Sequence, residues 1–250
     1  MTEFFTTPQG RRIAYRRTEG QGGGPGIVFI HGFRSDMNGS KIVDLESRAQ
    51  KSGRAMLCFD LSGHGESAAA NGDKVEDFGV SDWLEDAAAI IDQLATGPQV
   101  LVGSSLGGWL ALLLARNDSA DFAGLVTIAA APDFTTRMQG ELTADDQDQL
   151  AGQGYITRPT EYEGGDYVFS RRLFQQGAVQ QIFTTPLTLT MPTRMLIGTA
   201  DDAVPVSDAL QLIDHAKGPD IQLTLVKDAD HRFSTPDLLD LIWLSVVEVG

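Results

Sequence analysis

The chain has 250 residues, of which 42% are hydrophobic, and a net charge of −15. This length and apolar content suffice for one large core and fall short of two ordinary domains. The negative charge would repel nucleic acid and anionic membranes, so neither is expected as a partner. The one cysteine, Cys58, lies in an apolar run and cannot form an internal disulfide, so we expect it to be buried and inert.

The first twelve residues lack a basic start followed by an apolar stretch. The sequence therefore predicts no signal peptide and a cytoplasmic protein. The longest mostly apolar segment, residues 101–115, contains Ser and Gly and is shorter than the roughly 18 residues of a membrane span. We expect no membrane span.

Short apolar runs alternate with helical patterns along the chain. Residues 4–16 predict an antiparallel hairpin at a sheet edge. Core strands are expected at 26–30, 56–59, 100–103, 124–129, 194–198 and 221–226, and helices at 81–94, 106–116, 206–217 and 236–247. Because the strands are continuously apolar, we expect both of their faces to be buried under helices. The predicted fold class is α/β, with a mostly parallel doubly wound sheet.

One interval, residues 131–187, breaks this alternation. It contains no convincing core strand, mixes aromatic residues with glycine and acids, and is too long for a plain loop in a compact domain. We therefore expect a core formed by residues 1–132 and 188–250 and a lid inserted at 133–187. The arginines of the interval are candidates for pairing with an acidic substrate group; they are Arg137, Arg158, Arg171 and Arg172.

The stretch Gly103–Gly107 reads GSSLG and lies between a predicted strand and a predicted helix. This is the G-x-S-x-G pattern in the context that presents a serine at the tip of a sharp turn. Ser105 is the candidate nucleophile, because glycines lie two residues before it and two residues after it. The absence of a Cβ at both positions allows the backbone to approach closely there. Ser104 lacks such neighbours, and the alternative interpretation is a glycine-rich packing turn.

A serine nucleophile needs a histidine base and an orienting carboxylate, which follow it in the order Ser, Asp, His in this context. His231 lies in a loop after the strand at 221–226, whereas His215 lies within a predicted helix. Two adjacent acids, Asp201 and Asp202, follow the strand at 194–198. We choose His231 and Asp201, and expect Asp202 to cap the next helix or to face solvent.

Hydrolysis also builds negative charge on the carbonyl oxygen of the substrate, which backbone N–H groups commonly stabilise. Leu106 directly follows Ser105 at the start of a helix, so its N–H is one expected donor. The turn His31-Gly32-Phe33-Arg34 follows the strand at 26–30, and the N–H of Phe33 is the other. We expect a structural role for the His31 side chain, and a framing role for the glycine-rich loop at 60–67.

The chain resembles the α/β-hydrolase family over essentially its whole length, and four separate motifs carry the resemblance. They are His31-Gly32-Phe33 for the oxyanion loop, residues 60–67 for the D-x-x-G-x-G-x-S loop, Gly103–Gly107 for the nucleophile elbow, and 198–205 with His231 for the acid and base loops. Three further strings resemble the palmitoyl-protein thioesterase and acyl-glucuronide deacylase branch of that family. These are GPQVLVGSSLGGWL at 97–110, MNGSK at 37–41 and DHR at 230–232.

The resemblance implies hydrolysis of a carboxylic ester or thioester through an acyl-enzyme on Ser105, with a small-molecule or acylated-thiol substrate. We expect no metal or organic cofactor, because the sequence has no His/Cys cluster with metal-ligand spacing. Two alternatives stay open: a cofactor-free carbon–carbon bond hydrolase with the same three residues, and a non-catalytic ligand-binding protein of this fold. A dehalogenase is disfavoured because it would need a carboxylate at position 105.

Overall fold

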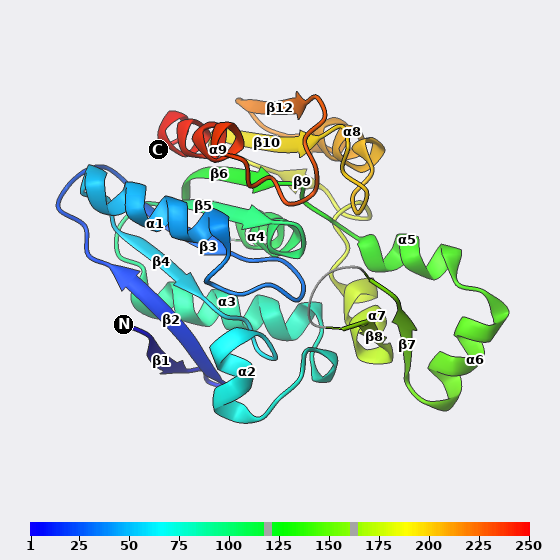
Figure 1. Cartoon of the computed structure of the whole chain (residues 1–250). Coiled ribbons are helices and arrows are strands. Elements are labelled where there is room, and N and C mark those ends of the chain that lie inside the picture. The colour runs from blue at the N-terminus through cyan, green and yellow to red at the C-terminus, as the bar shows by residue number, and fades with distance from the viewer. Residues whose placement is uncertain (118–121, 161–164) are drawn as a thin grey trace.

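A central sheet organises the computed structural model, which describes residues 1–117, 122–160 and 165–250 (Figure 1). Its order is β1-β2-β4-β3-β5-β6-β10-β12. The strands are β1 (Glu3–Thr6), β2 (Arg12–Thr18), β3 (Gly26–Ile30), β4 (Met56–Phe59), β5 (Gln99–Ser104), β6 (Phe122–Ile128), β10 (Thr193–Gly198) and β12 (Ile221–Val226). The hairpin β1–β2 is antiparallel and lies at the sheet edge, and β2 also pairs antiparallel with β4. The remaining neighbours in the sheet, β4-β3-β5-β6-β10-β12, pair in parallel. The predicted fold class and edge hairpin are confirmed.

Helices cover both faces of the sheet. They are α1 (Ser40–Ser52), α2 (Gly65–Asn71), α3 (Val80–Leu94), α4 (Leu106–Asn117), α8 (Val206–His215) and α9 (Pro236–Glu248), with a short 3-10 turn at Val75–Asp77. Apolar residues of α1 and α9 pack with one face of the central strands, and those of α3 and α4 pack with the other. The sheet is therefore a buried layer whose strand ends are free to carry loops.

The interval predicted as a lid forms a separate group of elements beside the sheet (Figure 1). They are α5 (Phe134–Glu141), α6 (Ala144–Gly152), β7 (Tyr155–Arg158), β8 (Tyr167–Ser170) and α7 (Arg171–Val179). Strands β7 and β8 pair only with each other among the described residues, so the interval adds nothing to the central sheet. The division at 133–187 itself stays a prediction.

Several elements differ from the predictions. Helices α1 and α2 were not predicted; α1 buries only Ile42, Leu45 and Ala49 within a strongly charged segment, which gives a weak apolar pattern. Strand β12 is the last strand of the sheet, and each of its residues is partly or fully exposed. The prediction that both faces of every strand are buried was therefore wrong for β12. Helix α8 ends at His215, because β11 (Ala216–Lys217) pairs with β9 (Leu187–Thr188).

The side chain of Cys58 lies inside this core, as the sequence indicates. The residue is 1% exposed on β4, and burial raises the pKa of its thiol to about 12. The thiolate is the reactive form of cysteine, so this group is protonated and unreactive at neutral pH. No helix in the described part of the chain combines the length and the apolar content needed to cross a bilayer.

Candidate active site

The turn between β5 and α4 presents Ser105 in a strained backbone conformation. Its φ of +56° lies in the left-handed region, which a residue with a Cβ rarely adopts. The Ser105 N–H donates to the carbonyl of Ile128 at 2.9 Å, and the Ser105 carbonyl accepts from the N–H of Ala131 at 3.1 Å. Neighbouring backbone therefore holds the turn in place, and the predicted strand-turn-helix context is confirmed.

Glycines on either side of Ser105 permit this geometry. A Cβ at Gly103 would strike the carbonyl of Gly107, and a Cβ at Gly107 would strike the carbonyl of Ile30 on β3. The two obstacles are backbone atoms, one in helix α4 and one in strand β3, which cannot rotate away as a side chain can. Both positions thus require the absence of a side chain.

Replacing Gly107 by alanine should lower the free energy of unfolding by about 2 kcal/mol, the cost of forcing an extra carbon into a filled core. Urea unfolding measures this change. The matched control is Gly140→Ala, because a Cβ at Gly140 meets no atom within 4 Å and its φ is not left-handed. Equal unfolding midpoints for Gly107→Ala and the wild type would contradict the expected clash.

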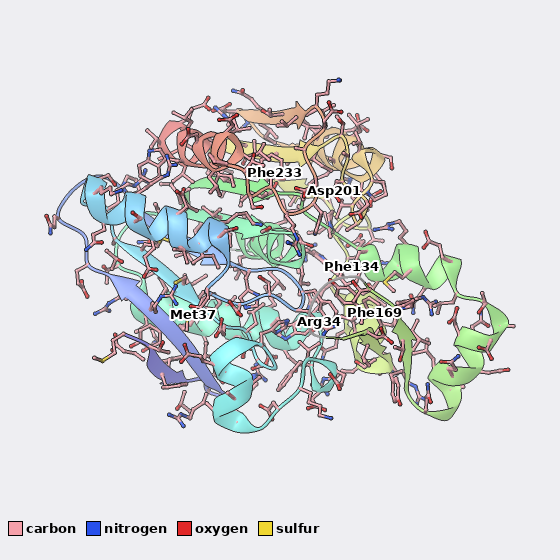
Figure 2. The ribbon with its side chains drawn as sticks, in the orientation of Figure 1. Arg34, Met37, Phe134, Phe169, Asp201 and Phe233 are labelled. Carbon is pink, nitrogen blue, oxygen red and sulfur yellow. The ribbon has the colours of Figure 1, made fainter. Side chains whose placement is uncertain are left out.

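His231 lies in the loop between β12 and α9, and Asp201 lies in the loop between β10 and α8. Figure 2 labels Asp201 together with Phe233, which lies in the same loop as His231. The imidazole Nδ1 lies 2.9 Å from Oδ2 of Asp201 and 3.0 Å from its Oδ1. The Asp201 side chain is fully buried, and its Oδ1 also accepts from the N–H groups of Ala203 at 2.9 Å and Val204 at 2.8 Å. The acid is therefore fixed, and it orients the ring of His231.

The neighbouring candidates lie elsewhere. Asp202 is exposed and does not cap α8, whose N-cap residue is Pro205. His215 ends α8 and directs its Nε2 to the carbonyls of Ile182 at 3.0 Å and Thr185 at 2.8 Å. Neither residue lines the cavity that contains Ser105.

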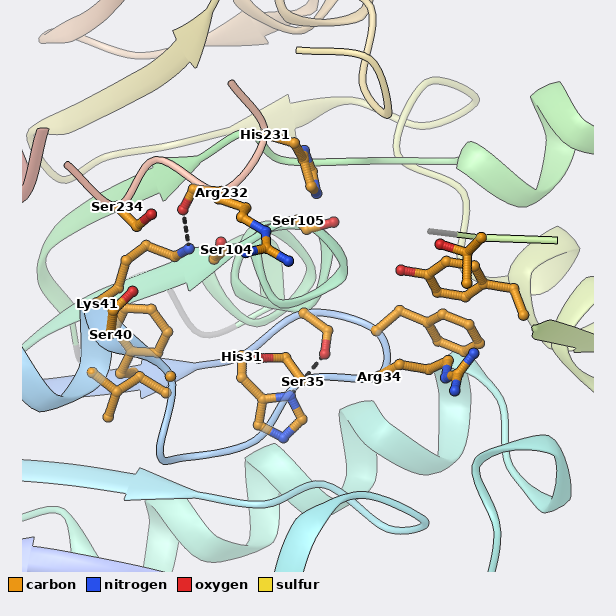
Figure 3. A pocket seen from close by; sticks show the side chains of 17 residues that line it. His31, Arg34, Ser35, Ser40, Lys41, Ser104, Ser105, His231, Arg232 and Ser234 are labelled. Carbon is orange, nitrogen blue, oxygen red and sulfur yellow. Dashed lines mark hydrogen bonds between the residues drawn. The ribbon is translucent and has the colours of Figure 1, made fainter. Parts of the chain in front are cut away.

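Ser105 and His231 both line a cavity of about 740 Å³ at the carboxyl ends of the strands (Figure 3). The hydrogen bonds of the described residues join His231 to Asp201 but include none between His231 and Ser105. The structure thus brings base and acid into contact and places the serine in the same cavity. Such hydrogen bonds commonly form or tighten only when substrate is bound.

The predicted oxyanion loop at residues 31–34 packs directly against the turn that carries Ser105. A Cβ at Gly32 would lie 3.1 Å from Cβ of Ser105, and Arg34 has a left-handed φ of +54°. Leu106 is the first residue of α4, so its N–H has no acceptor within the helix. Within the described ranges, neither the N–H of Phe33 nor that of Leu106 donates a hydrogen bond to a protein group. The roles of both donors stay a prediction.

Buried polar contacts beneath this loop support its shape. His31 accepts a hydrogen bond at Nε2 from the N–H of Leu61 at 3.1 Å, and burial lowers the pKa of the imidazole. The carboxylate of Asp60 accepts from the N–H groups of Met37 and Glu66, both at 2.7 Å. These contacts join the oxyanion loop to the loop at 60–67, consistent with the structural roles expected for both.

The cavity also contains basic residues that the sequence did not single out as functional. Lys41, Arg34 and Arg232 line it, and the guanidinium of Arg34 lies 4.9 Å above the ring of Tyr167. Arg34 Nη1 donates to the carbonyls of residues 165 and 166, each at 2.7 Å, which joins the oxyanion loop to the inserted hairpin. The available sequence signals were the strings MNGSK, which contains Lys41, and DHR, which contains Arg232.

The four arginines expected to meet an acidic substrate group have protein partners instead. Three of them form ion pairs: Arg137 with Asp208, Arg158 with Asp146, and Arg172 with Asp82. Arg171 donates to backbone carbonyls at the end of α6. None of the four lines the cavity that holds Ser105.

Comparisons with known proteins show the family and the fold of the chain. Residues 27–239 match the model of the alpha/beta hydrolase family. The rat (Rattus norvegicus) palmitoyl-protein thioesterase ABHD10, mitochondrial, is 36% identical over 96% of this chain and 79% of its own length. The solved structure of mouse alpha/beta hydrolase domain-containing protein 10 superposes with a TM-score of 0.89 at 32% identity, covering 100% of this chain and 98% of that one. A solved structure from Agrobacterium vitis S4 gives a TM-score of 0.93 at 33% identity, covering 100% and 98%.

The comparison corrects the predicted location. Relatives that match more than nine-tenths of the chain are named as mitochondrial proteins, which contradicts the expectation of a cytoplasmic protein. That expectation depended on the appearance of the first twelve residues alone. The residues that build the sheet and the cavity serve folding and chemistry, and they do not encode a compartment.

Proposed function

The chain belongs to the alpha/beta hydrolase family and is an ester or thioester hydrolase, and we propose that it acts through Ser105, His231 and Asp201. One observation carries the proposal: a buried carboxylate holds the Nδ1 side of the His231 ring in the cavity that contains a strained serine. A serine hydroxyl is a weak nucleophile until such a base accepts its proton.

In the proposed mechanism, Oγ of Ser105 attacks the acyl carbon while Nε2 of His231 accepts the hydroxyl proton. Asp201 accepts the hydrogen bond from Nδ1, which fixes the tautomer and stabilises the imidazolium. The N–H groups of Phe33 and Leu106 stabilise the negative charge on the carbonyl oxygen. His231 then protonates the departing alcohol or thiol, and it activates the water that releases the carboxylic acid from Ser105.

The proposed substrate is a thioester or ester of a fatty acid. The relatives named as palmitoyl-protein thioesterases support this class, as they are similar over almost the whole chain. An aromatic wall of the cavity supports it too: Phe33 and Tyr167 line the cavity and stack with ring centroids 6.0 Å apart. Phe169, which is not part of the lining, stacks on Phe33 at 5.5 Å. Such a wall offers apolar area to an acyl chain next to the proposed oxyanion donors.

A matched substrate series tests this proposal. We would compare p-nitrophenyl esters and S-acyl thioesters, from acetyl to palmitoyl, with the wild type and with Ser105→Ala. The proposal expects turnover that depends on Ser105 and increases with acyl length. Labelling of Ser105 by a phosphonate without turnover of any member would contradict acyl-ester chemistry and would favour carbon–carbon bond cleavage.

A further inference from the structure

A lysine from the first turn of α1 reaches the backbone beside the proposed base. Lys41 Nζ donates to the carbonyl of Arg232 at 2.6 Å, across 191 residues of sequence (Figure 3). Arg232 directly follows His231. The two partners belong to the strings MNGSK and DHR, to which the mechanism proposed above gives no role beyond His231 itself.

Part of the backbone of the loop around His231 is strained, so contacts with other segments of the chain are needed to hold its conformation. Asp228 and Phe233 have left-handed φ values of +61° and +50°, which cost energy in residues with a Cβ. On the side before His231, the loop is held by the acid loop: the N–H of Asp228 donates to Oγ1 of Thr199 at 2.8 Å. Directly after His231, the carbonyl of Arg232 is held by the Lys41 side chain.

We propose that Lys41 is a positioning residue for His231, whose ammonium group holds the carbonyl of Arg232 and thereby keeps the imidazole directed toward Ser105. The inference rests on the function proposed above. The same contact joins two halves of the site, because α1 follows the oxyanion loop in the chain. Lys41 thus fixes the distance between the oxyanion loop and the base.

The electrostatic surroundings of Lys41 make this contact sensitive to pH. Burial lowers the pKa of the ammonium group to about 8, Asp230 nearby favours the charged form, and Arg232 opposes it. The charged donor therefore predominates below about pH 8 and is lost as the pH rises through that value. A neutral amine makes a weaker hydrogen bond, so the orientation of His231 should loosen on the alkaline side.

The test measures the rate of Ser105 phosphonylation by a fluorophosphonate, and kcat on an acyl ester, between about pH 6 and pH 10. Lys41→Met should lower both rates about 10-fold at neutral pH, because small displacements of reacting groups are costly, and should remove the decline near pH 8. Lys41→Arg keeps a charged donor throughout, so it should retain activity and move the decline to higher pH.

Lys217→Met is the matched control, because Lys217 is exposed and also donates to one backbone carbonyl, that of Asp214, at 3.1 Å. It should behave as the wild type. Wild-type rates and an unchanged pH profile in Lys41→Met would overturn the inference. If that variant does not fold, the arginine variant decides, since an identical alkaline decline in Lys41→Arg and the wild type also overturns it. Absence of Ser105 labelling in the wild type would instead overturn the proposed function.

Discussion

Replacing Ser105 by alanine should lower kcat by about 10⁶-fold, the loss measured when a serine hydrolase loses its nucleophile. The substitution removes only the Oγ atom. Alanine occupies the same left-handed backbone conformation that Ser105 adopts at φ +56°, with the same Cβ, so the turn and the sheet should be unchanged. Initial rates on a p-nitrophenyl ester measure the loss, and urea unfolding verifies that stability is retained.

The neighbouring hydroxyl provides the control for this prediction. Ser104 lines the same cavity but ends β5 with its backbone in the strand. Ser104→Ala should keep kcat close to that of the wild type. If Ser104→Ala were inactive and Ser105→Ala active, the assignment of the nucleophile would be wrong.

Replacing Asp201 by asparagine should lower kcat by up to about 10⁴-fold, as in serine proteases with the corresponding change. The asparagine oxygen can still accept from the N–H groups of Ala203 and Val204, so the acid loop should keep its shape. Its amide nitrogen, however, donates where a carboxylate accepts, and it favours the tautomer of His231 that cannot take the Ser105 proton. The measurement is kcat and KM on one acyl ester.

An adjacent acid makes a strict control for charge. Asp202→Asn removes the same charge one residue away, at an exposed position. We expect kcat to change less than twofold, since exposed charges are screened by solvent. A large loss in Asp202→Asn together with near-normal activity in Asp201→Asn would refute the choice between the two acids.

Much of the fold could be predicted from sequence because the central strands are continuously apolar. Strands β3, β4 and β5 are buried along their whole length, so each appears in the sequence as a short, continuous apolar run of the kind typical of a parallel sheet. Helix α1 could not be recognised in this way, because only three of its residues are buried and polar or charged residues separate them in the sequence. Its existence depends on the sheet on which it packs.

Some residues of the candidate site could be predicted from the sequence and others could not. Ser105, Asp201 and His231 could be chosen because each follows a recognisable strand, and parallel strands bring their carboxyl ends to one edge of the sheet. Arg34 and Lys41 could not, because their contacts with residue 165 and Arg232 join loops far apart in sequence. No local pattern predicts which loops meet across a cavity.

The most direct measurement of the central claim is the mass of the enzyme during turnover. The wild type would be mixed with an S-palmitoyl thioester, quenched in acid at early times, and analysed by intact mass and peptide mapping. The account predicts a gain of one palmitoyl group on the peptide that carries Ser105, and no gain in Ser105→Ala. Release of thiol by the wild type with the acyl group on another residue would contradict the account.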